Sequence, residues 1–267
     1  MQSYVLYKIE GVDFVQSPQN NLPMQSDQSP SFQPLYMQIK QLVMRSLDAG
    51  EWKPGEAIPS ENELALRYKV SQGTVRKAID ALATEHIVVR RQGKGTFVAT
   101  HTEERSSMFR FLRMRSNDGI DEYPKSRLLD LRRLKATADV ARLLVLKPGE
   151  AVVSLRRVLE FAGAPVVLDE ITVQAALFKG LTRARFYAYH GSIYSFFETG
   201  FGVRMLRADE RLTAIAADPA SASILDVAIG TPLLAVDRVA YTYGDRPVEV
   251  RRGLCRTDAH HYLNQLG

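Results

Sequence analysis

The run SQGTVRK, residues 71–77, carries side chains that could recognise a nucleic acid. Backbone N–H groups at a helix start lack partners and attract anions, and Gly73 would let a phosphate or base edge approach closely. Gln72 could pair with adenine through two hydrogen bonds, and Arg76, one turn further on, with guanine or phosphate. If a helix begins here, its first turns are suited to reading DNA.

The same run also offers groups that suit phosphate. Lys77 and the hydroxyls of Ser71 and Thr74 could make contacts that position a protein without reading sequence. A second cationic group follows in the stretch RQGKG, which is slim enough for a minor groove; its members are Arg91, Gln92, Gly93 and Lys94. By itself, residues 71–77 could equally form a solvated amphipathic helix, so the neighbouring elements decide.

Three helices are predicted around this run. Apolar residues at helical spacing predict the first from Leu35 to Leu47, before Gly50. The second begins at Ser60, which forms a capping box with the glutamate three residues later. The third begins with its cap at Ser71.

A hairpin is predicted after the third helix. Two β-branched runs between residues 87 and 100 flank the turn QGKG. Helix, helix, turn, helix and hairpin is the order of a winged DNA-binding domain. We therefore add Ser60 and Glu61, at the start of the second helix, to the expected DNA-binding residues.

Composition agrees with a nucleic-acid partner but does not require one. The chain has 267 residues and a net charge of +5, with ten basic against seven acidic residues between positions 31 and 100. A lone cysteine, Cys255, allows no internal disulfide and suits a reducing cytoplasm. The N-terminus lacks a secretory pattern, and no apolar stretch approaches the ~18 residues of a membrane span. We expect a cytoplasmic protein with no membrane partner.

The N-terminal stretch is polar. Residues 16–34 are rich in Gln, Ser, Asn and Pro, so we expect residues 1–32 to be a disordered extension. Met24 lies inside it, which raises the hypothesis that translation starts there.

The C-terminal part contains an internal repeat. GEAVVSLRRVLEFAGAP and GTPLLAVDRVAYTYGDRP align with an offset of 81 residues, which matches Arg157 with Arg238 and Gly163 with Gly244. Each unit is predicted to be a short helix followed by a strand hairpin. Two such units could share one antiparallel sheet with helices on one face, an α+β domain.

The N-terminal motifs resemble a known family. PLYMQI, KPGEAIPSENELALRYKVSQGTVRKAIDAL and VVRRQGKGTFV are similar to the winged helix-turn-helix of the GntR family of bacterial regulators, over residues 34–99. Asn62 and Gln72 stand where the family often has arginine. One or two guanine or phosphate contacts of the family could therefore be absent here.

The remainder resembles the effector-binding UTRA domain of the HutC branch of that family. LKPGEAV, RRVLEFAGAPVVLDE, GSIYSFFE and GTPLLAVDRVAYTYGDRPVEV carry the resemblance. It implies an α+β fold like that of chorismate lyase, with an antiparallel sheet. The expected division is a winged domain over 33–99, a linker over 100–107 and an effector-binding and dimerisation domain over 108–267.

The resemblance also implies effector-binding residues. By motif these are Arg157, Asp169, Ser192 and Glu249, while Arg238 is expected to be structural. Leu159 stands where sugar-phosphate-binding members tend to have a second arginine, and Cys255 stands where the family has a tyrosine. The effector is left open among an organic acid, an amine and a sugar derivative.

Other chemistry finds less support. QGKGT lacks the ending of a phosphate loop, and the adjacent histidines near Asp258 point apart, so no metal or cofactor is expected. We expect a homodimeric repressor that binds double-stranded operator DNA and is released by a metabolite. An enzyme fused to a DNA-binding module and a non-specific nucleic-acid binder are the alternatives.

Overall fold

The computed structural model describes residues 33–101, 111–120 and 123–264. The predicted disorder of residues 1–32, the proposed start at Met24 and most of the predicted linker over 100–107 lie outside these residues.

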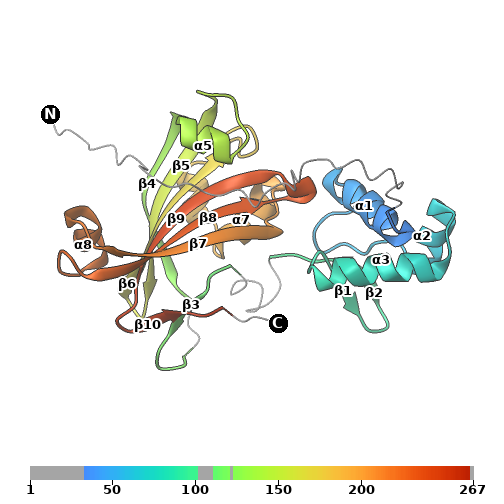
Figure 1. Cartoon of the computed structure of the whole chain (residues 1–267), viewed down its shortest axis with the longest axis horizontal. Helices are drawn as coiled ribbons and strands as arrows, with labels where there is room; N and C mark the ends of the chain where they lie inside the picture. The colour runs from blue at the N-terminus through green and yellow to red at the C-terminus, as the bar shows by residue number, and fades with distance from the viewer. Residues whose placement is uncertain (1–32, 102–110, 121–122, 265–267) are drawn as a thin grey trace, which may run out of the picture.

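The N-terminal domain has the predicted order of elements. Its helices are α1 (Leu35–Asp48), α2 (Glu61–Tyr68) and α3 (Gln72–Thr84), and its wing pairs β1 (Val88–Arg91) with β2 (Gly95–Val98). The apolar face of each helix meets in one core, which includes Val43, Leu64, Val75 and Leu82. In Figure 1 this domain, coloured blue to cyan, lies at one end of the molecule, far from α8.

Local sequence explains where these elements start and turn. The side chain of Ser60 accepts from the backbone N–H of Glu63, whose own side chain accepts from the Ser60 N–H, so the predicted capping box is present. Ser71 caps α3 by accepting from the Thr74 N–H. In the wing turn, Gly93 has φ of 69°, a conformation that glycine adopts without strain.

The C-terminal domain is built on one six-stranded antiparallel sheet with the order β4-β5-β6-β9-β8-β7. One unit contains β4 (Lys125–Lys135), α5 (Ala138–Leu143), β5 (Ala151–Phe161) and β6 (Ala164–Gln174). The other contains β7 (Arg207–Ala216), α8 (Pro219–Leu225), β8 (Pro232–Tyr241) and β9 (Pro247–Arg256), with the short 3-10 helix η1 (Tyr243–Asp245) between the last two strands. The predicted repeat is confirmed, and each unit also has a leading strand that the sequence analysis missed.

The helices of the two repeat units, α5 and α8, share one face of the sheet, as predicted. Val152 and Val250 pack with α5, and Val158 and Leu168 pack with α8, all from one face of the sheet. The opposite face is covered by α6 (Arg183–Ala188) and α7 (Ile193–Phe201), which lie between the two units in sequence. Their apolar run, including the buried Phe196 and Phe197, supplies that second core, so the sheet carries helices on both faces.

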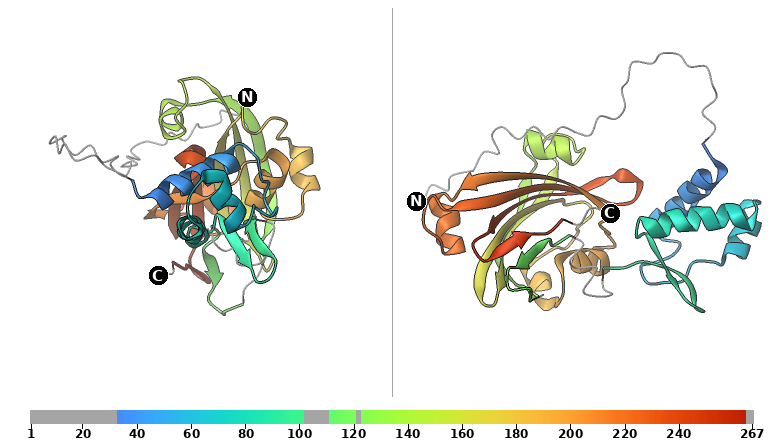
Figure 2. Two further views of the ribbon diagram at one scale, coloured as in Figure 1. Left: turned by 90° about the vertical axis from the view of Figure 1, so that its right-hand side faces the viewer. Right: turned by 60° about the horizontal axis from the view of Figure 1, so that its bottom comes forward.

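A small ribbon completes the domain. The strand β3 (Met114–Ser116) pairs antiparallel with β10 (His260–Tyr262) and brings the two ends of the domain together. Figure 2 shows the curved sheet with the N-terminal domain beyond one end of it.

Charged residues of opposite sign alternate across the whole sheet in one register row. From one edge strand to the other the row reads Asp130, Arg156, Glu170, Arg252, Asp237 and Arg211. The repeat relates the members of this row in pairs, and each pair joins an acidic to a basic residue. The pairs are Asp130 with Arg211, Arg156 with Asp237, and Glu170 with Arg252. The central pair, Glu170 and Arg252, is the point at which the two units meet.

Candidate DNA-binding surface and effector cavity

The predicted DNA-binding residues of α3 lie on its exposed side. Gln72, Gly73, Arg76 and Lys77 are all exposed at or near the helix start. A Cβ added to Gly73 would meet only the Ser71 hydroxyl, at 3.9 Å, so the space beside it is open. This end of α3 offers free backbone donors and two cations to a polyanion.

Glu61 joins this helix to the wing. Its carboxylate accepts from Arg76 Nε at 2.9 Å and from Arg90 Nη2 at 2.8 Å, and Arg90 also pairs with Asp80. Arg90 was not among the predicted DNA-binding residues, but it lies beside Arg76 through this shared carboxylate. Arg91 instead stacks on the Phe97 ring, with its guanidinium carbon 4.5 Å from the ring centre.

Three other predicted residues have structural partners. The Ser60 hydroxyl donates to Glu63 at 2.7 Å within the capping box, and the Ser71 and Thr74 hydroxyls lie 2.9 Å apart. The wing tip, formed by Gln92, Gly93 and Lys94, is exposed.

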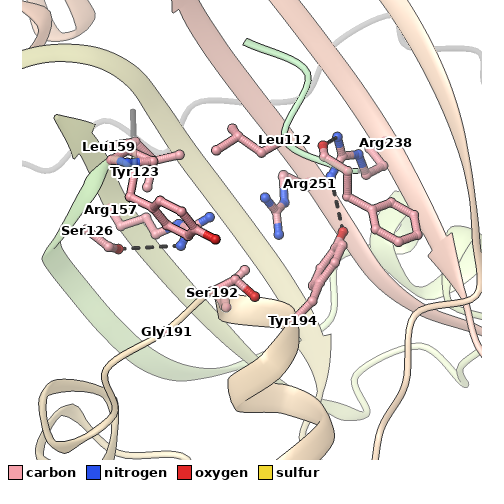
Figure 3. Close-up of a pocket in the computed structure, with 13 residues that line it drawn as sticks. Leu112, Tyr123, Ser126, Arg157, Leu159, Gly191, Ser192, Tyr194, Arg238 and Arg251 are labelled. Atoms are coloured by element: carbon pink, nitrogen blue, oxygen red, sulfur yellow. Dashed lines mark hydrogen bonds between the residues drawn. The ribbon is translucent and has the colours of Figure 1, made fainter. Parts of the chain in front are cut away.

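The C-terminal domain contains a cavity of about 190 Å³ between the sheet and the start of α7. Arg157 and Arg251 extend into it from the sheet, and Ser192 and Tyr194 border it from the helix (Figure 3). Arg238 lines it as well, and its guanidinium donates to Glu210, to the Tyr194 hydroxyl and to the Phe111 carbonyl, which agrees with the structural role expected for it. The apolar part of the wall consists of Phe111, Leu112, Tyr123, Pro124, Leu159 and Ile193.

The two predicted carboxylates lie behind the arginines and are not part of the cavity wall. Asp169 Oδ2 accepts from Arg157 Nε and Nη2 at 3.0 and 2.8 Å, and from Arg251 Nη1 at 3.3 Å. Glu249 accepts from Arg251 and, at 2.8 Å, from the Tyr194 hydroxyl. Their visible role is to hold Arg157 and Arg251 in place.

Gly253 makes room for this arrangement. It lies opposite Asp169 in the sheet, and a Cβ there would be 3.2 Å from an Asp169 carboxylate oxygen. Burial disfavours ionisation of Asp169, but the charges of Arg251 and Arg157 outweigh it and lower the pKa of this carboxyl. Asp169 is therefore a carboxylate that neutralises the arginines around it.

The cavity wall presents hydrogen-bond donors. A guanidinium has five N–H groups, and the described residues accept three from Arg157 and three from Arg251. Two donors therefore remain on each arginine. Ser192 is the N-cap of α7, whose first N–H groups face the same side, and the described lining residues include no carboxylate.

Two reactive side chains near the cavity are held in their protonated forms. Burial, the largest influence, raises the pKa of the Tyr194 phenol to about 12. Burial also raises the pKa of the Cys255 thiol. Neither group is a ready nucleophile near neutral pH.

The histidines near the C-terminus have separate partners. His260 packs edge-on against Phe161, and His261 Nδ1 lies 2.8 Å from the Asn117 side-chain oxygen. Among the described residues, no three His, Cys, Asp or Glu side chains lie together as a metal site would need. No helix in the described ranges is both long and apolar enough to cross a membrane.

Both parts of the chain match known families. The model of the gntR family of bacterial regulatory proteins matches residues 35–98, and the UTRA domain model matches residues 121–261. The HTH-type transcriptional regulator YurK of Bacillus subtilis is 30% identical over 80% of this chain and 88% of its own length. The histidine utilization repressor of Pseudomonas putida is 28% identical, over 88% of this chain and 92% of its own.

A solved structure supports the fold of the C-terminal domain. The ligand-binding domain of a GntR-family protein from Bordetella bronchiseptica superposes with a TM-score of 0.57 at 48% identity. The match covers 59% of this chain and 98% of the other. The α+β fold class and the two family resemblances predicted from the sequence are confirmed.

Proposed function

The chain belongs to the GntR family of bacterial regulatory proteins, and on that premise we propose that it is a homodimeric repressor released from its operator by a small organic anion. It is a DNA-binding transcriptional regulator with a UTRA effector-binding domain. Repression is supported by the histidine utilization repressor among its relatives. Operator DNA as the partner implies a cytoplasmic site of action.

The donor-only wall of the cavity carries the proposal for the effector. Arg157, Arg251 and the start of α7 offer N–H groups and positive charge, which a carboxylate or another anion accepts. An amine would find no carboxylate on the described wall, because Asp169 and Glu249 are occupied by arginines. The apolar wall around Leu159 favours a ligand with an apolar body.

For DNA binding we propose that α3 enters a major groove and the wing an adjacent minor groove. Gln72 and Arg76 would read bases, while Ser71, Thr74 and Lys77 would contact phosphates. Ser60 and Glu61 support this surface from the start of α2, since one caps that helix and the other holds Arg76. Two copies of the chain would read a two-fold operator, and light scattering should give twice the chain mass of 29.9 kDa.

Matched ligands test the effector class on the full chain. We expect benzoate to raise the melting temperature, while benzylamine and benzamide at the same concentration do not. Arg157→Gln should abolish the benzoate effect. Stronger stabilisation by benzylamine than by benzoate would contradict the proposal. Inorganic phosphate is the fourth compound, and if it stabilised the chain most, the proposed apolar body of the effector would be wrong. Release of an operator selected from random duplexes by the same anion then tests the regulatory role.

A further inference from the structure

Helix α7 connects the effector cavity to the junction with the DNA-binding domain. Its cap Ser192 and its first-turn residue Tyr194 line the cavity. Glu198, six residues beyond the cap and about 9 Å along the helix axis, lies at the opposite end. Glu198 is only 4% exposed, so its carboxylate needs partners at that end.

The partners of Glu198 belong to the segment that leaves the wing. Glu198 Oε2 accepts from the Thr100 hydroxyl at 2.6 Å and from the His101 backbone N–H at 2.7 Å. The His101 ring lies 5.8 Å from the rings of both Tyr194 and Phe111, which line the cavity. The chain that leaves the DNA-binding domain is therefore fixed between the two ends of α7.

Arg204 extends the contact to the recognition helix. Its Nε lies 3.3 Å from Glu198 Oε1, and its Nη1 and Nη2 donate to the carbonyls of Ile87 and His86 at 3.1 and 3.0 Å. These carbonyls follow directly after α3, where the helix dipole favours a cation. One guanidinium thus joins Glu198 to the end of the helix proposed to read DNA.

Both charges of this connection are buried. The side chains of Arg204 and Glu198 are 3% and 1% exposed. Loss of either side chain would leave the other charge buried with only neutral hydrogen-bond partners, so separation of the pair is costly. A displacement of α7 must then move the pair as a unit.

We propose that Glu198 is a positioning residue that couples the state of the effector cavity to the placement of the recognition helix. This rests on the proposed function of the cavity. An anion bound at the start of α7 changes the position of that helix, and Glu198 transmits the change to the linker and, through Arg204, to the end of α3. The two arrangements must differ in anion affinity for the coupling to operate.

The lone tryptophan provides a test that needs neither ligand nor operator. Trp52 lies in the core of the DNA-binding domain, so its fluorescence reports unfolding of that domain. Tyr194→Phe alters the cavity by removing the hydroxyl that joins Glu249 and Arg238. We expect this change to lower the Trp52 melting midpoint by about 2–4 °C in the wild-type chain and to leave it unmoved in the Glu198→Gln chain.

Either of two results would overturn the proposal: an equal shift in both backgrounds, or no shift in the wild-type chain. Thr199→Ala is the matched control, because Thr199 is the exposed neighbour of Glu198 on α7 and should leave the Tyr194→Phe shift intact. Far-UV circular dichroism checks the fold of each variant. Should Glu198→Gln fail to fold, Arg204→Lys replaces it in the same comparison. A wrong effector class would not affect these measurements, so failure of the proposed function is distinguishable.

Discussion

Glu61 places two arginines from different elements in one surface. Arg76 comes from α3 and Arg90 from the wing, and both donate to this one carboxylate. Before DNA is bound, Arg76 is thus pre-oriented and its charge is partly offset. If Arg76 contacts DNA as proposed, a base or phosphate would compete with Glu61 for the guanidinium, and that competition would help the site to discriminate between binding partners.

Replacement of Arg76 tests its reading role. We expect Arg76→Ala to weaken operator binding by about 1–3 kcal/mol and to relax the preference at one base pair. Lys77 is the adjacent cation, and Lys77→Ala should weaken binding to all DNA sequences alike and reduce the salt dependence of binding. Fluorescence anisotropy on the selected operator and its single-base variants measures both. If Arg76→Ala left the operator affinity and the base preference unchanged, Arg76 would not be part of the DNA-binding surface.

Cys255 illustrates how burial controls reactivity. It is 3% exposed and packs with Leu159 and Val167 beside the cavity, and burial raises the pKa of its thiol. We expect no reaction with a disulfide reagent at pH 8 in the folded chain and rapid reaction in urea, because the thiolate is the nucleophile. Rapid labelling of the native protein would show that this strand opens readily.

Among the elements, α2 depends most visibly on one side chain. Ser60→Ala removes the capping box and should lower the free energy of unfolding of the DNA-binding domain by about 0.5–2 kcal/mol. Urea unfolding followed by Trp52 fluorescence measures this loss. Ser60→Asp keeps a capping oxygen and should recover most of it, whereas equal losses for both variants would point to another role for Ser60.

Elements set by local signals could be predicted from the sequence. The caps at Ser60 and Ser71 and the wing turn at Gly93 follow from residues within a few positions. The repeat was visible because its glycines and arginines recur at a fixed offset. Its leading strands β4 and β7 were missed, since they lie at the sheet edges and are largely exposed.

The cavity could be predicted only in part. Arg157 and Ser192 lie on its wall as expected, but Arg251 and Tyr194 were missed. Whether a side chain faces the ligand depends on the register of β5, β6, β8 and β9, which no local pattern reveals. The same register placed Asp169 behind Arg157 and not on the cavity wall.

In the whole molecule, the junction between the domains should respond to pH. Burial raises the pKa of Glu198 above its ordinary value of 4.5. Between the ordinary pKa, which applies to the unfolded chain, and the raised pKa of the folded chain, the folded state holds a proton that the unfolded state has released. The contribution of Glu198 to stability therefore falls as pH rises through this window. We expect the stability of the wild-type chain relative to Glu198→Gln to decline from pH 4.5 upward.

Urea unfolding of both chains across this range measures the difference. Asp169, whose pKa is lowered, acts in the opposite sense and loses its contribution as pH falls, but it is common to both chains and cancels. Parallel pH curves for the two chains would show that Glu198 does not titrate differently on folding.

The charged row across the sheet also bears on the history of the fold. A sheet made of two matched units has the form expected if one half-length gene was duplicated and fused. In a symmetric pair of such half-length chains the residue on the two-fold axis, now Glu170 in one unit and Arg252 in the other, would have faced its own copy. Two like charges in that position repel. If the halves arose in this way, a row of alternating charge could form only after fusion let the two copies mutate independently.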